Sequence, residues 1–205
     1  MNVLIGGETS GEIREAFRRR GHDAFSCDLL PADTASRYHI QRDMREALND
    51  DAWDLFIVHP TCTYLCNSSV WCLHRDITRW PKMVEAAVFF RDMLNVDVPH
   101  VAAENPVMHG YALTIIGQRA SQFIQPWQFG EDASKATGLW LKNLPLLKPT
   151  NIIKKHRYAN QTPSGQNKES PGPDRWKIRS RTYHGIAEAM AEQWGNIEAI
   201  TKRAP

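Results

Sequence analysis

The sequence predicts an α/β protein with a doubly wound, mostly parallel sheet. Short apolar runs alternate with helix-like stretches over the first half of the chain, and such alternation favours β-α-β units. The run 55–58 (Leu-Phe-Ile-Val) is apolar at every position, which is typical of a strand buried on both faces of a sheet. Polar residues follow several of these runs directly. Open sheets of this class bind ligands beyond the carboxyl ends of their strands, so we expect the functional site there.

The elements follow from local patterns taken in order. We expect the first helix to be capped by Ser10 and to end at Gly21, because Ser favours the N-cap and Gly follows the last helical turn. The stretch 80–94 has apolar residues at helical spacing. The predicted strands are 2–5, 23–27, 55–58, 98–103, 122–129 and 138–144, and the predicted helices are 11–20, 37–48, 80–94 and 186–194.

The composition indicates a globular protein and excludes a wholly disordered one. Of the 205 residues, 42% are hydrophobic and 23% are charged. No apolar run approaches the ~20 residues of a membrane-spanning helix, and no secretory signal opens the chain. Four cysteines without such a signal favour reduced thiols, so we expect a cytoplasmic protein. We expect a single domain: a core (1–144), a basic loop (145–181) and a C-terminal helix (182–205).

The net charge of +2 hides an asymmetry. Residues 1–60 carry seven Lys and Arg against eleven Asp and Glu, whereas residues 151–181 carry eight against two. One basic segment in a near-neutral protein indicates local contact with a polyanion. Basic side chains around an aromatic ring suit phosphate and base contact, with a solvated loop as the alternative. The candidate nucleic-acid-binding residues are Arg175, Trp176, Lys177, Arg179 and Arg181.

A glycine-rich turn, residues 6–11, follows the first predicted strand. Glycines let a backbone approach a ligand closely, and the next helix offers free N–H groups. The dinucleotide fingerprint spacing is absent and Glu8 is a poor neighbour for phosphate, so a nucleoside-bearing cationic cofactor fits better than a pyrophosphate. Asp28 ends the second strand, where a ribose-binding acid lies in doubly wound folds. A tight turn and a surface acid are the alternative interpretations.

Two further strand ends carry groups suited to covalent chemistry. Cys62 follows the buried strand in the loop His59-Pro60-Thr61-Cys62, and Glu104 ends the next predicted strand. If those strands are neighbours, both side chains face one crevice. A thiolate and a carboxyl group then suit covalent attack on a heteroaromatic ring whose nitrogen is hydrogen-bonded by the carboxyl group. Taken singly, a buried Cys is more often a small hydrophobe.

These residues resemble a known family, the DNA cytosine-5 methyltransferases. The shared order is a glycine-rich turn, Asp28, Asp43, Pro60-Thr61-Cys62 and Glu104-Asn105-Pro106, where the family has Pro-x-Cys and Glu-Asn-Val. The stretch 182–192 looks like the last family motif, a helix that completes the cofactor pocket. The resemblance spans almost the whole chain and is closest to short methyltransferase-like proteins carried by bacteriophages, which implies the cytoplasm of a bacterium or a phage-infected host cell. It implies a sheet of the S-adenosylmethionine-dependent methyltransferase type.

The resemblance also implies roles for individual residues. The Cys62 thiolate would add to carbon 6 of cytosine, Glu104 would hold ring N3 and the amino edge, and carbon 5 would take the methyl group of S-adenosylmethionine. Asn105 belongs to the same motif as Glu104, and Lys135 stands where the family has an arginine-rich motif. For the cofactor, Asp28 would meet the ribose and Asp43 the adenine amino group. The full implied cofactor set is Gly7, Glu8, Ser10, Gly11, Asp28, Asp43 and Pro60.

Departures from the family keep other functions open. Thr63 stands where the family has Gln, and only the basic loop can replace the large target-recognition region, unless a homodimer partner helps. The partner is therefore duplex or single-stranded DNA, or a free pyrimidine nucleotide. A third alternative is a degenerate fold that binds nucleic acid or a nucleotide without turnover. The Cys and His residues of 59–74 lack the spacing of common zinc sites, so no metal is expected.

Overall fold

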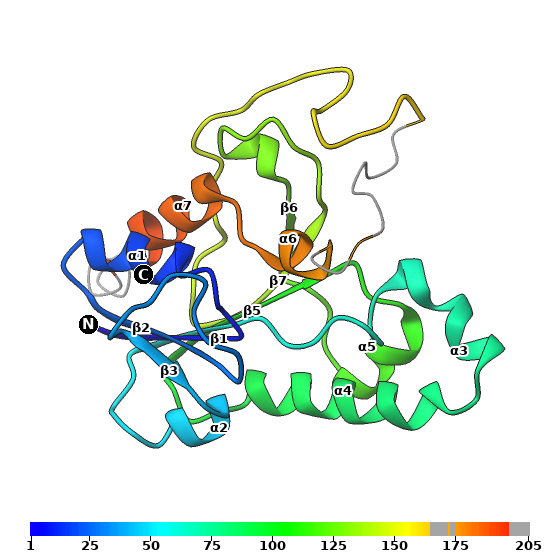
Figure 1. Ribbon diagram of the computed structural model, residues 1–205, viewed down its shortest axis with the longest axis horizontal. Coiled ribbons are helices and arrows are strands. Elements are labelled where there is room, and N and C mark those ends of the chain that lie inside the picture. The colour runs from blue at the N-terminus through cyan, green and yellow to red at the C-terminus, as the bar shows by residue number, and fades with distance from the viewer. Residues whose placement is uncertain (165–171, 173–174, 197–205) are drawn as a thin grey trace.

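The computed structural model describes residues 1–164, 172 and 175–196. The side chains of Arg175, Trp176 and Ile178 lie outside the described part. A seven-stranded sheet crosses the molecule, with helices on both of its faces (Figure 1). In spatial order its strands are β3 (His39–Gln41), β2 (Asp23–Asp28), β1 (Asn2–Gly6), β4 (Leu55–Val58), β5 (His100–Pro106), β7 (Thr137–Lys142) and β6 (Gln122–Ile124).

The sheet is mostly parallel, which confirms the predicted fold class. The first five strands in spatial order pair in parallel, whereas β7 runs antiparallel to both β5 and β6. The chain moves outward from β1 to β3 and then returns to β4 on the other side of β1. This reversal leaves a crevice beyond the carboxyl ends of β1 and β4, where ligands of open sheets bind.

Helices cover the two faces of the sheet as separate layers (Figure 1). The helices α1 (Glu12–Arg19) and α7 (His184–Trp194) pack together on one face, and α4 (Arg79–Leu94) and α5 (Gly110–Ile116) pack together on the other. Alternate residues of β4 enter the two cores that these layers close. Both faces of the strand are thus buried, which explains its uninterrupted apolar run. Across the described ranges, no helix has the length and apolar character that crossing a membrane requires.

Two predicted elements are wrong in part. The helix expected at 37–48 is instead the edge strand β3 followed by a short helix, α2 (Met44–Ala47). Asp43 separates them, because its side chain accepts a hydrogen bond from the Arg45 N–H and starts the helix there. The strand expected at 122–129 stops at Ile124, since Pro126 has no N–H for the ladder and begins the short 3₁₀ helix Pro126–Gln128.

The sequence patterns also missed three helices. These are α3 (Trp71–Arg75), α5 and, within the segment expected to be a loop, α6 (Arg175–Ser180). For α5 the end signals are present: the His109 ring caps its first turn, and Gly117 ends it with φ 75°. The helices are five, seven and six residues long, too short for a clear apolar repeat.

Candidate active site

Cys62 and Glu104 lie on adjacent chain segments at the crevice, because the strands that precede them are paired. Val58 at the end of β4 pairs with Ala103 of β5, so the loop 59–62 lies beside Glu104 and Asn105. The side-chain amide of Asn105 donates a 2.9 Å hydrogen bond to the Pro60 carbonyl and fastens the two segments together. The two strands are thus neighbours, as the proposed pairing of Cys62 with Glu104 requires.

A tight turn places a second thiol next to Cys62. The Cys62 carbonyl accepts hydrogen bonds from the N–H groups of Leu65 (3.0 Å) and Cys66 (3.1 Å), so the chain folds back by one helical turn. The Cys66 thiol donates a hydrogen bond to the Cys62 sulfur and thereby stabilises the Cys62 thiolate. Together with the positive charges of Lys135 and Arg179, this hydrogen bond lowers the pKa of Cys62 to about 6, although burial raises it. The pKa of Cys66 is raised, since it holds the shared proton. Cys62 is therefore mostly thiolate at neutral pH.

Lys135 reaches this group from the loop that leads into β7. Its ammonium group donates to the Arg179 carbonyl (2.9 Å), and its backbone N–H donates to the Gln125 side chain (2.9 Å). The positive charge of Lys135 lowers the pKa of both Cys62 and Glu104. The residue chosen from a reduced family motif thus lies close enough to act on both groups. Its catalytic role remains a prediction.

His59 is the residue that the sequence interpretation missed, since it was considered there only as a metal ligand. Its Nδ1 lies 3.1 Å from Oε2 of Glu104, and the two side chains are 15% and 11% exposed. The contact is an ion pair without hydrogen-bond alignment, because Glu104 Oε2 accepts no hydrogen bond. Burial opposes both charges, yet the pair lowers the pKa of Glu104 and raises that of His59. A His directly after a buried strand was the available signal.

Unsatisfied polar atoms gather in this same place. His59 Nε2, Glu104 Oε2 and Asn105 Oδ1 are buried and have no hydrogen-bond partner among the described residues. Such atoms cost free energy unless a ligand or water satisfies them. Three of them on adjacent residues indicate a site built to bind a polar group.

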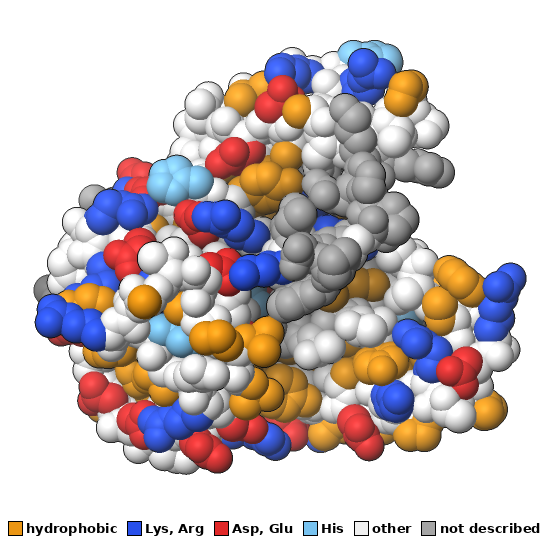
Figure 2. Space-filling model, in the orientation of Figure 1, with side chains coloured by type: hydrophobic (Ala, Val, Ile, Leu, Met, Phe, Trp, Pro, Cys, Tyr) orange, Lys and Arg blue, Asp and Glu red, His pale blue; other side chains and the backbone are white. Residues whose placement is uncertain are grey.

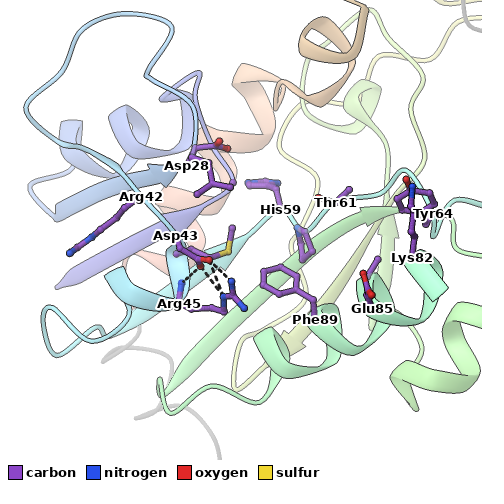
Figure 3. Close-up of a pocket in the computed structure, with 15 residues that line it drawn as sticks. Asp28, Arg42, Asp43, Arg45, His59, Thr61, Tyr64, Lys82, Glu85 and Phe89 are labelled. Atoms are coloured by element: carbon purple, nitrogen blue, oxygen red, sulfur yellow. Dashed lines mark hydrogen bonds and ion pairs between the residues drawn. The ribbon is translucent and has the colours of Figure 1, made fainter. Parts of the chain in front are cut away.

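A cavity of about 610 Å³ opens beside His59, within the usual range of small-molecule sites. Figure 3 shows Asp28, Asp43 and Phe89 around it, contributed by β2, the start of α2 and α4. A smaller cavity of about 110 Å³ adjoins it, since Gly7, Asp28 and His59 line both. Six of the seven predicted cofactor residues line these cavities. The larger cavity is lined by Gly7, Asp28, Asp43 and Pro60, and the smaller cavity by Gly7, Glu8, Ser10 and Asp28. Gly11 lines neither cavity.

The glycine-rich turn is shaped by contacts that the sequence did not reveal. Gly7 has φ 78°, and a Cβ there would lie 2.6 Å from the His59 carbonyl oxygen. The cap of α1 differs in part from the prediction. The N-cap residue is Gly11 and the Glu8 carboxylate accepts from the Ile13 N–H at 2.8 Å, while the Ser10 hydroxyl accepts only a long hydrogen bond, 3.4 Å, from the Glu12 N–H. A carboxylate suits the positive end of a helix, although burial raises the pKa of Glu8.

The two aspartates at the larger cavity differ in how far their carboxylates are engaged. Asp28 Oδ1 accepts the Leu30 N–H at 2.9 Å. The Asp43 carboxylate caps α2 and forms an ion pair with the Arg45 guanidinium; these Arg45 contacts lower the pKa of Asp43. Asp28 is therefore the less committed acid. Its predicted contact with a ribose, and that of Asp43 with adenine, remain predictions.

The end of the basic segment, residues 177–181, lies beside the smaller cavity. Lys177 pairs with Asp33 at 2.8 Å, Arg181 pairs with Glu12, and both cations line the smaller cavity. Arg179 lies near Cys62, whose pKa its charge lowers. The Arg175 and Trp176 side chains lie outside the described residues, so their predicted contacts stay predictions. Figure 2 shows Lys and Arg interspersed with acidic side chains among the coloured residues of this face.

Comparisons with known proteins find a similar fold. A scan of protein-family models and a search of curated proteins find no match. Among solved structures, an E. coli protein described as a "putative DNA modification methyltransferase encoded within prophage" matches 75% of this chain and 52% of its own, at 15% identity and TM-score 0.47. The Entamoeba histolytica methyltransferase EhMeth matches 77% of this chain and 57% of its own, at 14% identity and TM-score 0.46. This chain spans little more than half the length of either protein, and the likeness concerns the fold alone.

Proposed function

We propose that this protein transfers a methyl group from S-adenosylmethionine to carbon 5 of cytosine in DNA through a covalent Cys62 adduct. One arrangement carries the proposal: a thiol with a pKa lowered to about 6 lies on the loop that Asn105 ties to its own strand, and Glu104 and Asn105 of that strand have buried, unsatisfied polar atoms. A thiolate is the reactive form of a cysteine nucleophile. Unsatisfied carboxylate and amide oxygens next to it suit the polar edge of a ring.

The residues of the two cavities fit S-adenosylmethionine. Asp28 offers a carboxylate at the junction of both cavities, suited to the two hydroxyl groups of a ribose. The Phe89 ring lines the larger cavity and offers an apolar wall for a base. Lys177 and Arg181 at the smaller cavity have more N–H donors than their ion pairs with Asp33 and Glu12 use, and the remaining donors are suited to the carboxylate of the methionine part. When bound, the cofactor supplies an electrophilic methyl group.

A free pyrimidine nucleotide is the second candidate substrate. The favouring observation is that Lys177 and Arg181 are already paired with Asp33 and Glu12. A cation that is already paired with a carboxylate neutralises a phosphate group less well than a free cation does. DNA binding depends on the neutralisation of many phosphate groups. A nucleotide carries few charges and needs no large recognition surface.

The decisive experiment is methyl transfer from tritium-labelled S-adenosylmethionine to duplex DNA, single-stranded DNA and dCMP. Transfer to DNA is expected, and transfer to dCMP alone would promote the nucleotide enzyme. A 5-fluorocytosine substrate should trap the protein covalently, because fluorine blocks the final proton loss from carbon 5.

Cys62→Ser and Cys72→Ser form a matched pair for this assay. Cys62→Ser should abolish both transfer and trapping, because a hydroxyl is far less nucleophilic at neutral pH. Cys72 lies in α3 and should tolerate the same change. Full turnover by Cys62→Ser would overturn the proposed mechanism.

A further inference from the structure

We propose that His59 is a positioning residue that supplies, through Glu104, the proton needed at ring N3 when Cys62 attacks carbon 6. The inference rests on the proposed function and deepens it. His59 is the first residue after β4, and its Nδ1 lies 3.1 Å from Glu104 Oε2.

The need for a proton follows from the charges around Glu104. His59 and Lys135 lower the pKa of Glu104, so its carboxyl group is ionised at neutral pH. An ionised carboxylate accepts hydrogen bonds but donates none. It can accept from the amino group of cytosine, yet it cannot give ring N3 the hydrogen that makes carbon 6 electrophilic. A neighbouring acid has to provide that hydrogen.

The position of His59 suits it to this task. The His59 N–H donates to the Gly6 carbonyl at 2.8 Å, and Gly7 packs against the His59 carbonyl, so the backbone is held on two sides. The ring faces Glu104 and lines both cavities, and its Nε2 has no hydrogen-bond partner among the described residues. It therefore joins the cofactor cavities to the carboxyl group that meets the substrate.

The charged groups that act on the ring favour its protonated form. Burial and the ammonium group of Lys135 lower the pKa of His59, whereas the carboxylates of Glu104 and Glu8 raise it, and the net direction is upward. Lys135 itself is a poorer proton source for Glu104, because its ammonium group is committed to the Arg179 carbonyl. Imidazolium, in contrast, releases its proton near neutral pH.

The proton balance closes over one cycle. As the Cys62 sulfur bonds to carbon 6, the electron pair of the C5=C6 double bond shifts to C4–C5, and the pair of C4=N3 shifts to N3. Ring N3 takes a proton from Glu104, which takes one from His59 Nδ1 across the 3.1 Å contact once the imidazole turns its N–H into line with Oε2. After methyl transfer, carbon 5 loses its proton to solvent and the thiolate departs. Ring N3 then returns its proton through Glu104 to His59.

The first test measures the His59 ring directly and needs no substrate. NMR titration of the imidazole in the full chain should place the His59 midpoint above the ordinary value of about 6.5. In Glu104→Gln the midpoint should fall, because the partner charge is gone. A wild-type midpoint at or below the ordinary value would overturn the inference.

The second test follows covalent trapping by a 5-fluorocytosine oligonucleotide as a function of pH. In His59→Gln the trapping rate should fall by about 10²-fold near pH 7, the low end for general acid catalysis. The pH optimum of trapping by His59→Gln should move to lower pH, where solvent protonates Glu104. The affinity of this variant for the oligonucleotide should equal that of the wild-type protein. The control is His156→Gln, at an exposed position. An unchanged pH profile in His59→Gln overturns this inference alone, whereas no trapping by the wild-type protein overturns the proposed function.

Discussion

The side-chain amide of Asn105 donates a 2.9 Å hydrogen bond to the Pro60 carbonyl, and this contact joins the loop of Cys62 to the strand that carries Glu104. Asn105 is 1% exposed, so the bond is screened from water. Cys62 lies two residues beyond Pro60, and Glu104 lies directly before Asn105. The relative position of the two proposed reactive groups therefore depends on this buried hydrogen bond as well as on the pairing of β4 with β5.

Asn105→Ala should lower the free energy of unfolding by about 1–3 kcal/mol, because it leaves the Pro60 carbonyl buried without a donor. Urea denaturation measures this change, and covalent trapping should slow as the loop loses its tie. Asn95→Ala is the control, since the Asn95 amide donates to the Arg91 carbonyl at an exposed helix end. Equal losses in the two variants would contradict the importance assigned to the buried bond.

The reactivity of Cys62 should follow its lowered pKa. Because the thiolate forms above a pKa of about 6, alkylation by iodoacetamide should reach half its maximal rate near that pH. Cys66→Ala removes the donor thiol and should move the midpoint up towards the ordinary value of about 8.5. Cys66→Ser keeps a donor and should move it less.

Cys27 provides the internal comparison for this measurement. Burial raises the pKa of Cys27 to about 11, so it should resist alkylation at neutral pH. Mass spectrometry of the labelled peptides distinguishes the two sites. Labelling of Cys27 ahead of Cys62 at pH 7 would show that the wrong thiol has been assigned.

Gly7→Ala and Gly21→Ala separate backbone strain from close contact. Both glycines have positive φ, 78° and 81°, so each alanine costs about 1–2 kcal/mol of left-handed strain. A Cβ at Gly7 also meets the His59 carbonyl at 2.6 Å, whereas nothing lies within 4 Å at Gly21. Gly7→Ala should therefore lose about 1–3 kcal/mol more in thermal or urea unfolding. Equal losses of unfolding free energy in the two variants would show that the backbone around Gly7 moves to accommodate the added Cβ at little cost.

Asp28→Ala should weaken S-adenosylmethionine binding by about 1.5–3 kcal/mol, the usual contribution of a hydrogen bond to a charged group. Isothermal titration measures the change. Asp23→Ala is the matched control, because Asp23 begins the same strand that Asp28 ends and is exposed. Absence of binding by the wild-type protein at millimolar cofactor would reject the methyltransferase proposal.

The salt dependence of DNA binding tests the basic segment. Replacing Arg175, Lys177, Arg179 and Arg181 together by Ala should weaken binding to all sequences. Each lost phosphate contact should flatten the log–log salt slope by about 0.7–0.9. Because Lys177 and Arg181 have acidic partners, the double variant of these two should change the slope less than the quadruple one. No measurable DNA binding at low salt would favour the nucleotide substrate.

Local sequence patterns were sufficient for the main strands and helices. The apolar run 55–58, the helical spacing of 80–94 and the glycine after α1 all have their predicted structures. These predictions succeed because each feature is visible in a few consecutive residues. Burial on two faces gives an unbroken apolar run, burial on one face gives helical spacing, and helix termination favours glycine. The helix expected at 37–48 failed because pairing with β2 makes residues 39–41 an edge strand. That pairing is not visible in the local sequence.

The sequence by itself determined which chemical groups stand at the strand ends, because each group follows its strand directly in the chain. Tertiary structure alone decided which groups meet. The pairing of β4 with β5 brings His59 to Glu104, and the antiparallel return of β7 carries Lys135 towards them. The ion pair of Lys177 with Asp33 joins two residues far apart in the sequence at the smaller cavity. The physical reason is that sheet register and packing, rather than local propensity, set distances between residues far apart in sequence.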